Sequence, residues 1–142
     1  MDVFSKEKRS EVMRRIRSKN TKPELKVRKE LHSRGYRFRL HCKELPGKPD
    51  IVLPKFRTAI QVRGCFWHGH DCKDGHIPKT RNDYWVPKIA GNKRRDLKND
   101  RKLRAMGWTV IVVWACRVEP TKGLERSIHR ITKILKRCEL IL

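Results

Sequence analysis

The feature that most constrains the fold of this chain is the segment GCFWHGHDC, residues 64–72, taken together with one distant cysteine. The segment places Cys65, His70 and Cys72 close together, and Cys116 follows a long apolar run much later in the chain. Zinc binds such sets of cysteine and histidine tetrahedrally, and four protein ligands leave no position for water. We therefore predict a structural zinc site at these residues. Cys65 follows one expected strand and Cys116 follows another, so the four ligands would meet at one end of the sheet if these two strands are neighbours.

Two features of this cluster stay open on the sequence alone. Cys116 could instead be a small buried hydrophobic residue, which is a common role for cysteine. His68 could exchange with His70 as the ligand, although a His70 that turns inward would leave His68 facing elsewhere. The odd count of five cysteines, with no apolar secretory leader in MDVFSKEKRS, favours metal binding over disulfides. Cys42 and Cys138 are then ordinary thiols.

Hydrophobic periodicity and turn residues predict the element order α-α-β-β-β-α-β-α, a single α/β domain over residues 1–142 with one mixed sheet and helices on its faces. The expected elements are a basic N-terminal helix or arm within residues 1–19, a helix over 21–35, strands over 36–40, 51–53 and 58–62, a polar loop over 73–88, a basic helix from about 88 to 106, a strand over 108–114 and a helix from about 121. The strand over 108–114 is β-branched and almost continuously apolar, which predicts burial on both faces.

The helix over 21–35 carries its own boundary signals. Thr21 and Glu24 have the spacing of a capping box, Pro23 lies in the first turn, and Gly35 can provide the left-handed stop. Its expected apolar side consists of Leu25, Val27 and Leu31, and the last helix carries a core stripe of Leu124, Ile128, Ile131 and Leu135.

The charge of the chain points to a polyanionic partner. Lys and Arg number 37 against 15 Asp and Glu, which gives a net charge of +22. Phosphate contacts and counterion release make nucleic acid the leading candidate, with a basic but non-binding surface and an anionic membrane as weaker alternatives. No apolar run of membrane-spanning length occurs, and we expect a cytoplasmic protein.

The strand region resembles the PD-(D/E)xK nuclease core. Asp50 in KPD supplies a carboxylate for Mg²⁺, Gln61 stands where the second acid would be, and Arg63 stands where the lysine would be. Glu24 matches the acidic residue that this core often supplies from its first helix. His68 is the histidine left over from the zinc set, and we expect it to act as general base or acid. The alternative is a loop histidine that bonds a carbonyl group.

Four sequence blocks, LPGKPDIVLP, GCFWHGHDC, KTRNDYWVPKI and GWTVIVVWAC, are together similar to the very-short-patch repair (Vsr) endonucleases. This resemblance covers roughly residues 5 to 140 and implies a restriction-endonuclease-like core with a structural zinc. It also implies double-stranded DNA with a T:G mismatch as substrate, nicked on the 5′ side of the thymine. Such mismatches arise by deamination of 5-methylcytosine, so the implied setting is DNA repair in the bacterial nucleoid, with mismatch-repair proteins as further candidate partners.

The resemblance also implies roles for individual residues. Asp50 and the carbonyl of Val62 would hold Mg²⁺, with Glu24 and His68 in catalysis. The zinc set would be Cys65, His70, Cys72 and Cys116, the aromatic wedges Phe66, Trp67 and Trp85, and the groove-reaching residues Met13, Lys88 and Asn92. Core packing is the alternative role for Trp67 and Trp85. The family often has Thr and His where this chain has Val62 and Arg63, and a permanent cation cannot act as a base.

The sequence leaves two other functions open. One is a non-catalytic DNA-binding module stapled by zinc, and the other is a restriction-like nuclease of different specificity that cuts both strands. We expect a monomer that does not bind membranes. The sequence does not indicate the flanking bases or the partner methyltransferase.

Overall fold

The computed structural model describes residues 20–141. In chain order the elements are α2 (Lys22–Ser33), β1 (Arg39–Leu40), β2 (Ile51–Leu53), the 3-10 turn η1 (Pro54–Phe56), β3 (Thr58–Arg63), the 3-10 turn η2 (Lys73–Gly75), α3 (Asn82–Ala105), β4 (Thr109–Trp114), α4 (Ala115–Val118) and α5 (Thr121–Ile141). The predicted helix or arm within residues 1–19, which includes Met13, lies outside this range. Within it, no helix combines the length and the apolar character needed to cross a bilayer.

The strands form one mixed sheet in the order β1-β2-β3-β4. β1 and β2, and then β2 and β3, pair antiparallel, whereas β3 and β4 pair parallel. A parallel pair needs a long crossover connection, and α3 lies within it. The parallel register places Arg63 opposite Trp114, so the two strands end at the same edge of the sheet. This mixed α/β sheet fits the predicted restriction-endonuclease-like core.

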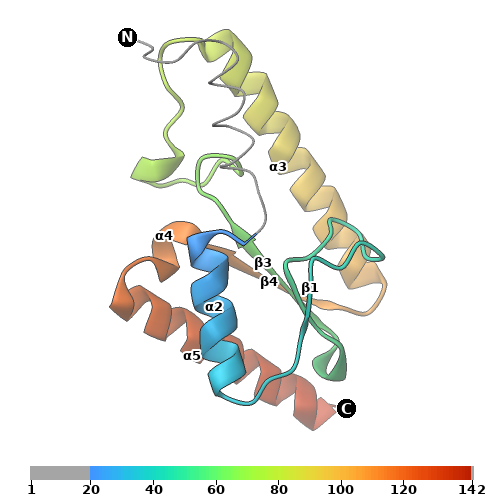
Figure 1. The fold of residues 1–142 in the computed structure, drawn as a ribbon. Helices are drawn as coiled ribbons and strands as arrows, with labels where there is room; N and C mark the ends of the chain where they lie inside the picture. Colours follow the sequence, from blue (N-terminus) through green and yellow to red (C-terminus); the bar gives the residue numbers. More distant parts are fainter. Residues whose placement is uncertain (1–19, 142) are drawn as a thin grey trace.

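Helices α2 and α5 cover one face of the sheet (Figure 1). The main core lies between these layers and contains Val27, Leu31, Ile51, Leu53, Phe56, Ile60, Ile111, Val113, Val118, Ile128, Ile131 and Leu135. Burying one large aliphatic side chain is worth about 1.5 to 3 kcal/mol, so this layer fixes the sheet against both helices. Leu124 is the partly buried member of the predicted α5 stripe and packs against the same core.

The opposite face of the sheet is less apolar than predicted. On β4, Ile111 and Val113 are buried, whereas Val110 and Val112 are only half-buried. The predicted burial of this strand on both faces is therefore wrong for one face. The reason is that α3 meets this face with charged groups, as in the contact between its Asp100 and Arg63.

The boundaries of α2 agree with the sequence better than its side-chain roles do. Thr21 is the N-cap and Gly35 follows the helix with φ +87°, but the Thr21 side chain makes no capping hydrogen bond. Glu24 is buried and contacts Arg28 and His41 instead. The predicted capping box is therefore wrong: Thr21 makes no side-chain cap, and Glu24 turns to Arg28 one turn along α2 and to His41. Leu25, expected on the apolar side, is exposed.

Three other expectations about the elements are also wrong. The strand predicted over 36–40 is only Arg39–Leu40, and the short α4 was not anticipated. Helix α3 begins at Asn82 rather than near Lys88, and so includes Pro87. Proline lacks one helical hydrogen bond, but burial of Trp85 among other aromatic rings stabilises this first part of the helix.

Candidate nuclease and metal sites

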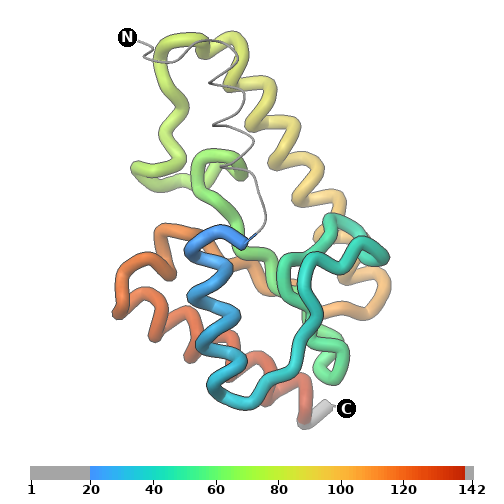
Figure 2. The backbone as a smooth tube through the Cα atoms, viewed as in Figure 1, coloured from blue at the N-terminus to red at the C-terminus, as the bar shows by residue number. Residues whose placement is uncertain are grey.

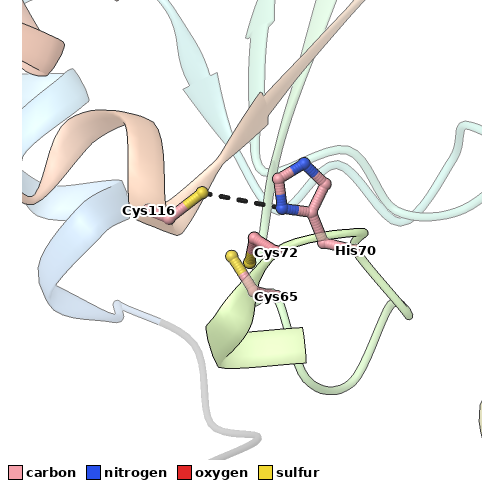
Figure 3. A group of neighbouring side chains, drawn as sticks. All are labelled: Cys65, His70, Cys72 and Cys116. Carbon is pink, nitrogen blue, oxygen red and sulfur yellow. Dashed lines mark hydrogen bonds between the residues drawn. The ribbon is translucent and has the colours of Figure 1, made fainter. Parts of the chain in front are cut away.

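The four predicted zinc ligands come together at the edge where β3 and β4 end. Cys65, His70 and Cys72 come from the segment after β3, and Cys116 comes from α4, directly after β4 (Figure 3). One ligand atom from each lies within 4.8 Å of the others, and Cys116 Sγ lies 3.6 Å from His70 Nδ1. The parallel pairing of β3 with β4 brings together residues that are far apart in the sequence.

Backbone hydrogen bonds curl the segment after β3 around this cluster. The His70 N–H donates to the Cys65 carbonyl and the Cys72 N–H donates to the His70 carbonyl, each at 2.9 Å. A Cβ on Gly75 would lie 1.9 Å from the His70 carbonyl oxygen, so only glycine fits there. The His70 ring stacks on Trp114 at 4.1 Å between centroids. The loop thus has a defined shape that presents its ligands inward.

The donor set fits a closed zinc site. Thiolate and imidazole are the ligands that zinc favours in structural sites. Burial, together with the neighbouring thiols, raises the pKa of the Cys65 thiol to about 12. A cation would compensate the cost of ionising this buried thiol, because ligating cysteines bind as thiolates. Cys42 and Cys138 lie outside the cluster, as expected: Cys42 contacts Glu44, and Cys138 contacts Thr58 and Thr109.

A second site is a cavity of about 460 Å³ between the start of α2, the ends of the strands and α3. Every predicted catalytic residue lines it. The full lining is Thr21, Pro23, Glu24, Gly47, Lys48, Asp50, Gln61, Val62, Arg63, Gly64, Trp67, His68, Asn92, Asp96, Asn99 and Ala115. Figure 2 shows the segment over 64–81 running beside the first half of α3, away from the C-terminal end of α5.

Asp50 directly precedes β2 and is held by the neighbouring strand β3. The Val62 N–H donates to Asp50 Oδ2 at 2.7 Å. Extending the β2–β3 register by one residue from the Ile51–Ile60 pair brings Asp50 opposite Gln61. Burial raises the pKa of Asp50 from 3.8 to about 6, against the opposing effect of the Val62 hydrogen bond. Desolvation disfavours the charged form of this carboxylate, and a bound cation would stabilise that form.

Arg63 is not a free cation beside Asp50. Its guanidinium donates to both carboxylate oxygens of Asp100, at 2.8 and 3.0 Å, and its Nε lies 3.9 Å from Asp96. The ion pair is buried, so it connects β3 to α3. Arg63 was predicted to stabilise charge on the phosphate, but its own charge is already paired with Asp100.

His68 lies apart from the cysteine cluster and lines the cavity with Asp50. Its Nδ1 lies 2.6 Å from Asp96 Oδ2, and the side chain is part-exposed. A carboxylate on one ring nitrogen fixes the orientation of the imidazole and leaves Nε2 as the other polar atom of the ring. His70 thus lies in the cysteine cluster, whereas His68 lies in the cavity that Asp50 lines.

Glu24 adds a second carboxylate to the Asp50 side of the cavity. Its Oε2 contacts the Arg28 guanidinium and lies 2.9 Å from His41 Nε2. Ligand atoms of Glu24, His41 and Asp50 all lie within 4.8 Å of one another. The sequence reading missed His41, along with the α3 carboxylates Asp96 and Asp100. An available signal was that His41 directly follows an expected strand in the segment leading to Asp50.

The predicted wedge residues pack against one another. Ring centroids are 5.2 Å apart for Phe66–Trp67, 5.0 Å for Phe66–Trp85 and 5.7 Å for Trp67–Trp85, all edge to face. Phe66 and Trp67 are half-buried, whereas Trp85 is buried. The position of Trp85 agrees with the packing alternative, and the other two rings are the more accessible ones.

Of the three residues predicted to reach into the DNA grooves, the structure describes Lys88 and Asn92, and both lie on α3. Lys88 is half-buried, and its Nζ donates to the Tyr84 hydroxyl at 3.4 Å and lies 5.6 Å from the Tyr84 ring centroid. The Asn92 side chain donates to the Trp67 carbonyl at 2.8 Å and lines the cavity. Asn92 therefore fixes the aromatic segment against α3, whereas Lys88 contacts Tyr84 one turn earlier on the same helix.

Comparisons with known proteins point in one direction. A family model described as "DNA mismatch endonuclease Vsr" matches residues 1–74. The chain is 52% identical over 130 residues to "Type II nicking enzyme V.XorIIP" of Xanthomonas oryzae pv. oryzae, covering 92% of this chain and 96% of that protein. It is 46% identical over 135 residues to "Type II nicking enzyme V.NmeAIP" of Neisseria meningitidis, covering 95% and 96%. It is 39% identical over 115 residues to "DNA mismatch endonuclease Vsr" of Escherichia coli, covering 81% and 74%.

Proposed function

This chain belongs to the Vsr family of DNA mismatch endonucleases, and we propose that it nicks one strand of duplex DNA on the 5′ side of the T in a T:G mismatch. Membership of this family makes the chain a DNA endonuclease. We further propose its specificity for the T:G mismatch, its Mg²⁺ and Zn²⁺ ions and its role in repair. The observation that carries it is the cavity in which Asp50, Glu24 and the His68–Asp96 pair lie together. The proposed setting is repair of deaminated 5-methylcytosine in the bacterial cytoplasm.

The residues around Asp50 fit a divalent ion. In an antiparallel ladder, the N–H and C=O of one residue point to the same neighbouring strand. Because the Val62 N–H donates to Asp50, the Val62 carbonyl is directed to the Asp50 side as well. Carboxylate and carbonyl oxygens are the ligands that Mg²⁺ prefers. When bound, Mg²⁺ would supply Lewis-acid stabilisation of charge on the phosphate.

His68 is the residue best placed to move a proton. With Nδ1 on Asp96, its Nε2 can accept a proton from water or donate one to the leaving oxygen. Arg63, on β3, supports the His68–Asp96 contact indirectly. Its guanidinium binds Asp100 and lies near Asp96, and both of these carboxylates are on α3. We assign Arg63 a positioning role rather than direct contact with the phosphate.

In this proposal the cysteine cluster holds a structural zinc. Four protein ligands would close the site to substrate, so the ion would shape the loop and take no part in hydrolysis. The loop carries Phe66 and Trp67, which would enter the base stack at the mismatch. A wobble pair stacks less well than a matched pair, so inserting a ring there costs less.

A strand-resolved cleavage assay tests this function. The wild-type protein, with Mg²⁺, is expected to nick the T strand of a T:G duplex at least about tenfold faster than a matched T:A or C:G duplex. Unstacking a base costs a few kcal/mol and least at a mismatch, and a saving of about 1.4 kcal/mol is tenfold in rate. The substrates differ only in the central pair, and each strand carries its own label. Cleavage of both strands regardless of pairing would favour a restriction-like nuclease, and binding without cleavage would favour a DNA-binding module.

Because the pKa of Asp50 is raised, the difference in free energy of unfolding between the Asp50→Asn variant and the wild type should depend on pH. The folded carboxyl titrates near 6 rather than 3.8, so the folded state loses stability as pH rises between these values, and the loss is complete above about 6. Asp50→Asn removes this penalty. We expect the variant to exceed the wild type in free energy of unfolding by about 1 to 3 kcal/mol at pH 8 without Mg²⁺, and the gap to shrink towards pH 4.

Denaturant melts at several pH values measure this gap. Glu125→Gln is the matched control, because Glu125 is exposed on α5 and away from the cavity. A pH-independent difference between Asp50→Asn and wild type, or a less stable variant at pH 8, would contradict the burial penalty at Asp50.

A further inference from the structure

His41 is the one imidazole that lies directly among the carboxylates on the Asp50 side of the cavity, within the part of the chain that the structure describes. Its Nε2 is 2.9 Å from Glu24 Oε2, and its ligand atom lies within 4.8 Å of those of Glu24 and Asp50. Its backbone N–H donates to the Asp50 carbonyl at 3.1 Å. The side chain is largely buried, at 15% exposure. His41 is thus tied to Asp50 through its main chain and to Glu24 through its ring.

The two carboxylates keep oxygens that could bind an ion. The contacts of Glu24 with Arg28 and with His41 both use Oε2. The contact of Asp50 with the Val62 N–H uses Oδ2. Each carboxylate therefore has a second oxygen to offer. The cluster thus consists of the Glu24 and Asp50 carboxylates and the His41 imidazole. The Arg28 guanidinium beside Glu24 offsets part of the negative charge.

The imidazole changes which ions this donor set prefers. Mg²⁺ favours oxygen ligands and keeps several waters, whereas imidazole suits transition metals. Mn²⁺ accepts both carboxylate and imidazole and has the same charge as Mg²⁺. We propose that His41 is a third ligand of the ion at Glu24 and Asp50, and that it biases this site towards Mn²⁺ over Mg²⁺. This inference rests on the proposed function, because it requires a divalent ion at Asp50.

Binding of the two ions without DNA tests the inference independently of activity. Mn²⁺ or Mg²⁺ is titrated into the zinc-loaded full chain by calorimetry, with free Mn²⁺ also followed by electron paramagnetic resonance. His41→Gln keeps an amide that can donate to Glu24 but removes the ligating nitrogen. We expect about a tenfold or larger loss of Mn²⁺ affinity, with Mg²⁺ affinity changed less than about threefold. His32→Gln is the matched control, because His32 is exposed on α2 outside the cluster.

Two other variants and one spectrum separate the possible failures. Unchanged Mn²⁺ binding in His41→Gln, or an equal loss for both ions, would overturn the inference, because His41 would then only support Glu24. Asp50→Asn is expected to lose both ions, and wild-type binding by that variant would instead overturn the proposed ion at Asp50. If His41→Gln does not fold, the wild-type protein decides: nitrogen hyperfine coupling to bound Mn²⁺ supports His41 ligation, and its absence overturns it.

Discussion

Replacing Asp50 with asparagine is expected to abolish nicking of a T:G duplex while DNA binding persists. The asparagine amide would keep an oxygen for the Val62 N–H but lose the negative charge that a divalent ion needs. Lewis-acid stabilisation is worth several kcal/mol, and each 1.4 kcal/mol is a factor of about ten in rate, so we expect a loss of about a thousandfold or more. The measurement is a single-turnover assay with Mg²⁺ on a strand-labelled T:G duplex.

Binding and folding controls make this result specific. Fluorescence anisotropy on the same duplex without Mg²⁺ is expected to give affinities within about threefold for Asp50→Asn and wild type, because the wider basic surface supplies the phosphate contacts. Glu125→Gln, an acid-to-amide change on exposed α5, is expected to nick at the wild-type rate. Nicking by Asp50→Asn at more than about a tenth of the wild-type rate would be incompatible with an ion held by this carboxylate.

Replacing Cys116 with serine is expected to release the structural zinc and to unfold the loop after β3. Serine is a poor zinc ligand, and Cys116 is the ligand that joins this loop to the end of β4. Loss of a structural metal is among the largest effects of a point substitution, so we expect a fall of about 4 kcal/mol in the free energy of unfolding. Nicking is also expected to fall, since the same loop carries His68.

Metal content and thermal melts measure this effect together. The wild-type protein is expected to hold about one zinc per chain, and Cys116→Ser much less than half of that. Cys42→Ser is the matched thiol-to-hydroxyl control, because Cys42 lies outside the cluster. A Cys116→Ser protein that keeps its zinc and its melting temperature would show that Cys116 is the small hydrophobic residue considered as the alternative.

The sequence by itself determined much of the chemistry at the sheet edge. Each strand there is marked by a short apolar run and followed by a chemically distinctive residue, as with Cys65 after β3 and Cys116 after β4. The zinc ligands were expected to meet if these strands are neighbours, and the two strands do pair, in parallel. The place of Asp50 opposite Gln61 could be predicted for a similar reason, because two short strands joined by a tight turn have few possible registers.

Only the tertiary structure decided which partners these groups have. The contacts His41–Glu24, His68–Asp96 and Arg63–Asp100 join residues 17, 28 and 37 positions apart. Such pairs depend on how α2 and α3 are rotated and placed against the sheet, and that placement is set by packing of the whole core rather than by local spacing. Local patterns predict which residues share an element and a face, because backbone geometry fixes those periods. They do not predict which carboxylate meets which cation. In this protein, Glu24 lines the cavity and contacts His41 instead of capping α2, and the charge of Arg63 is paired with Asp100.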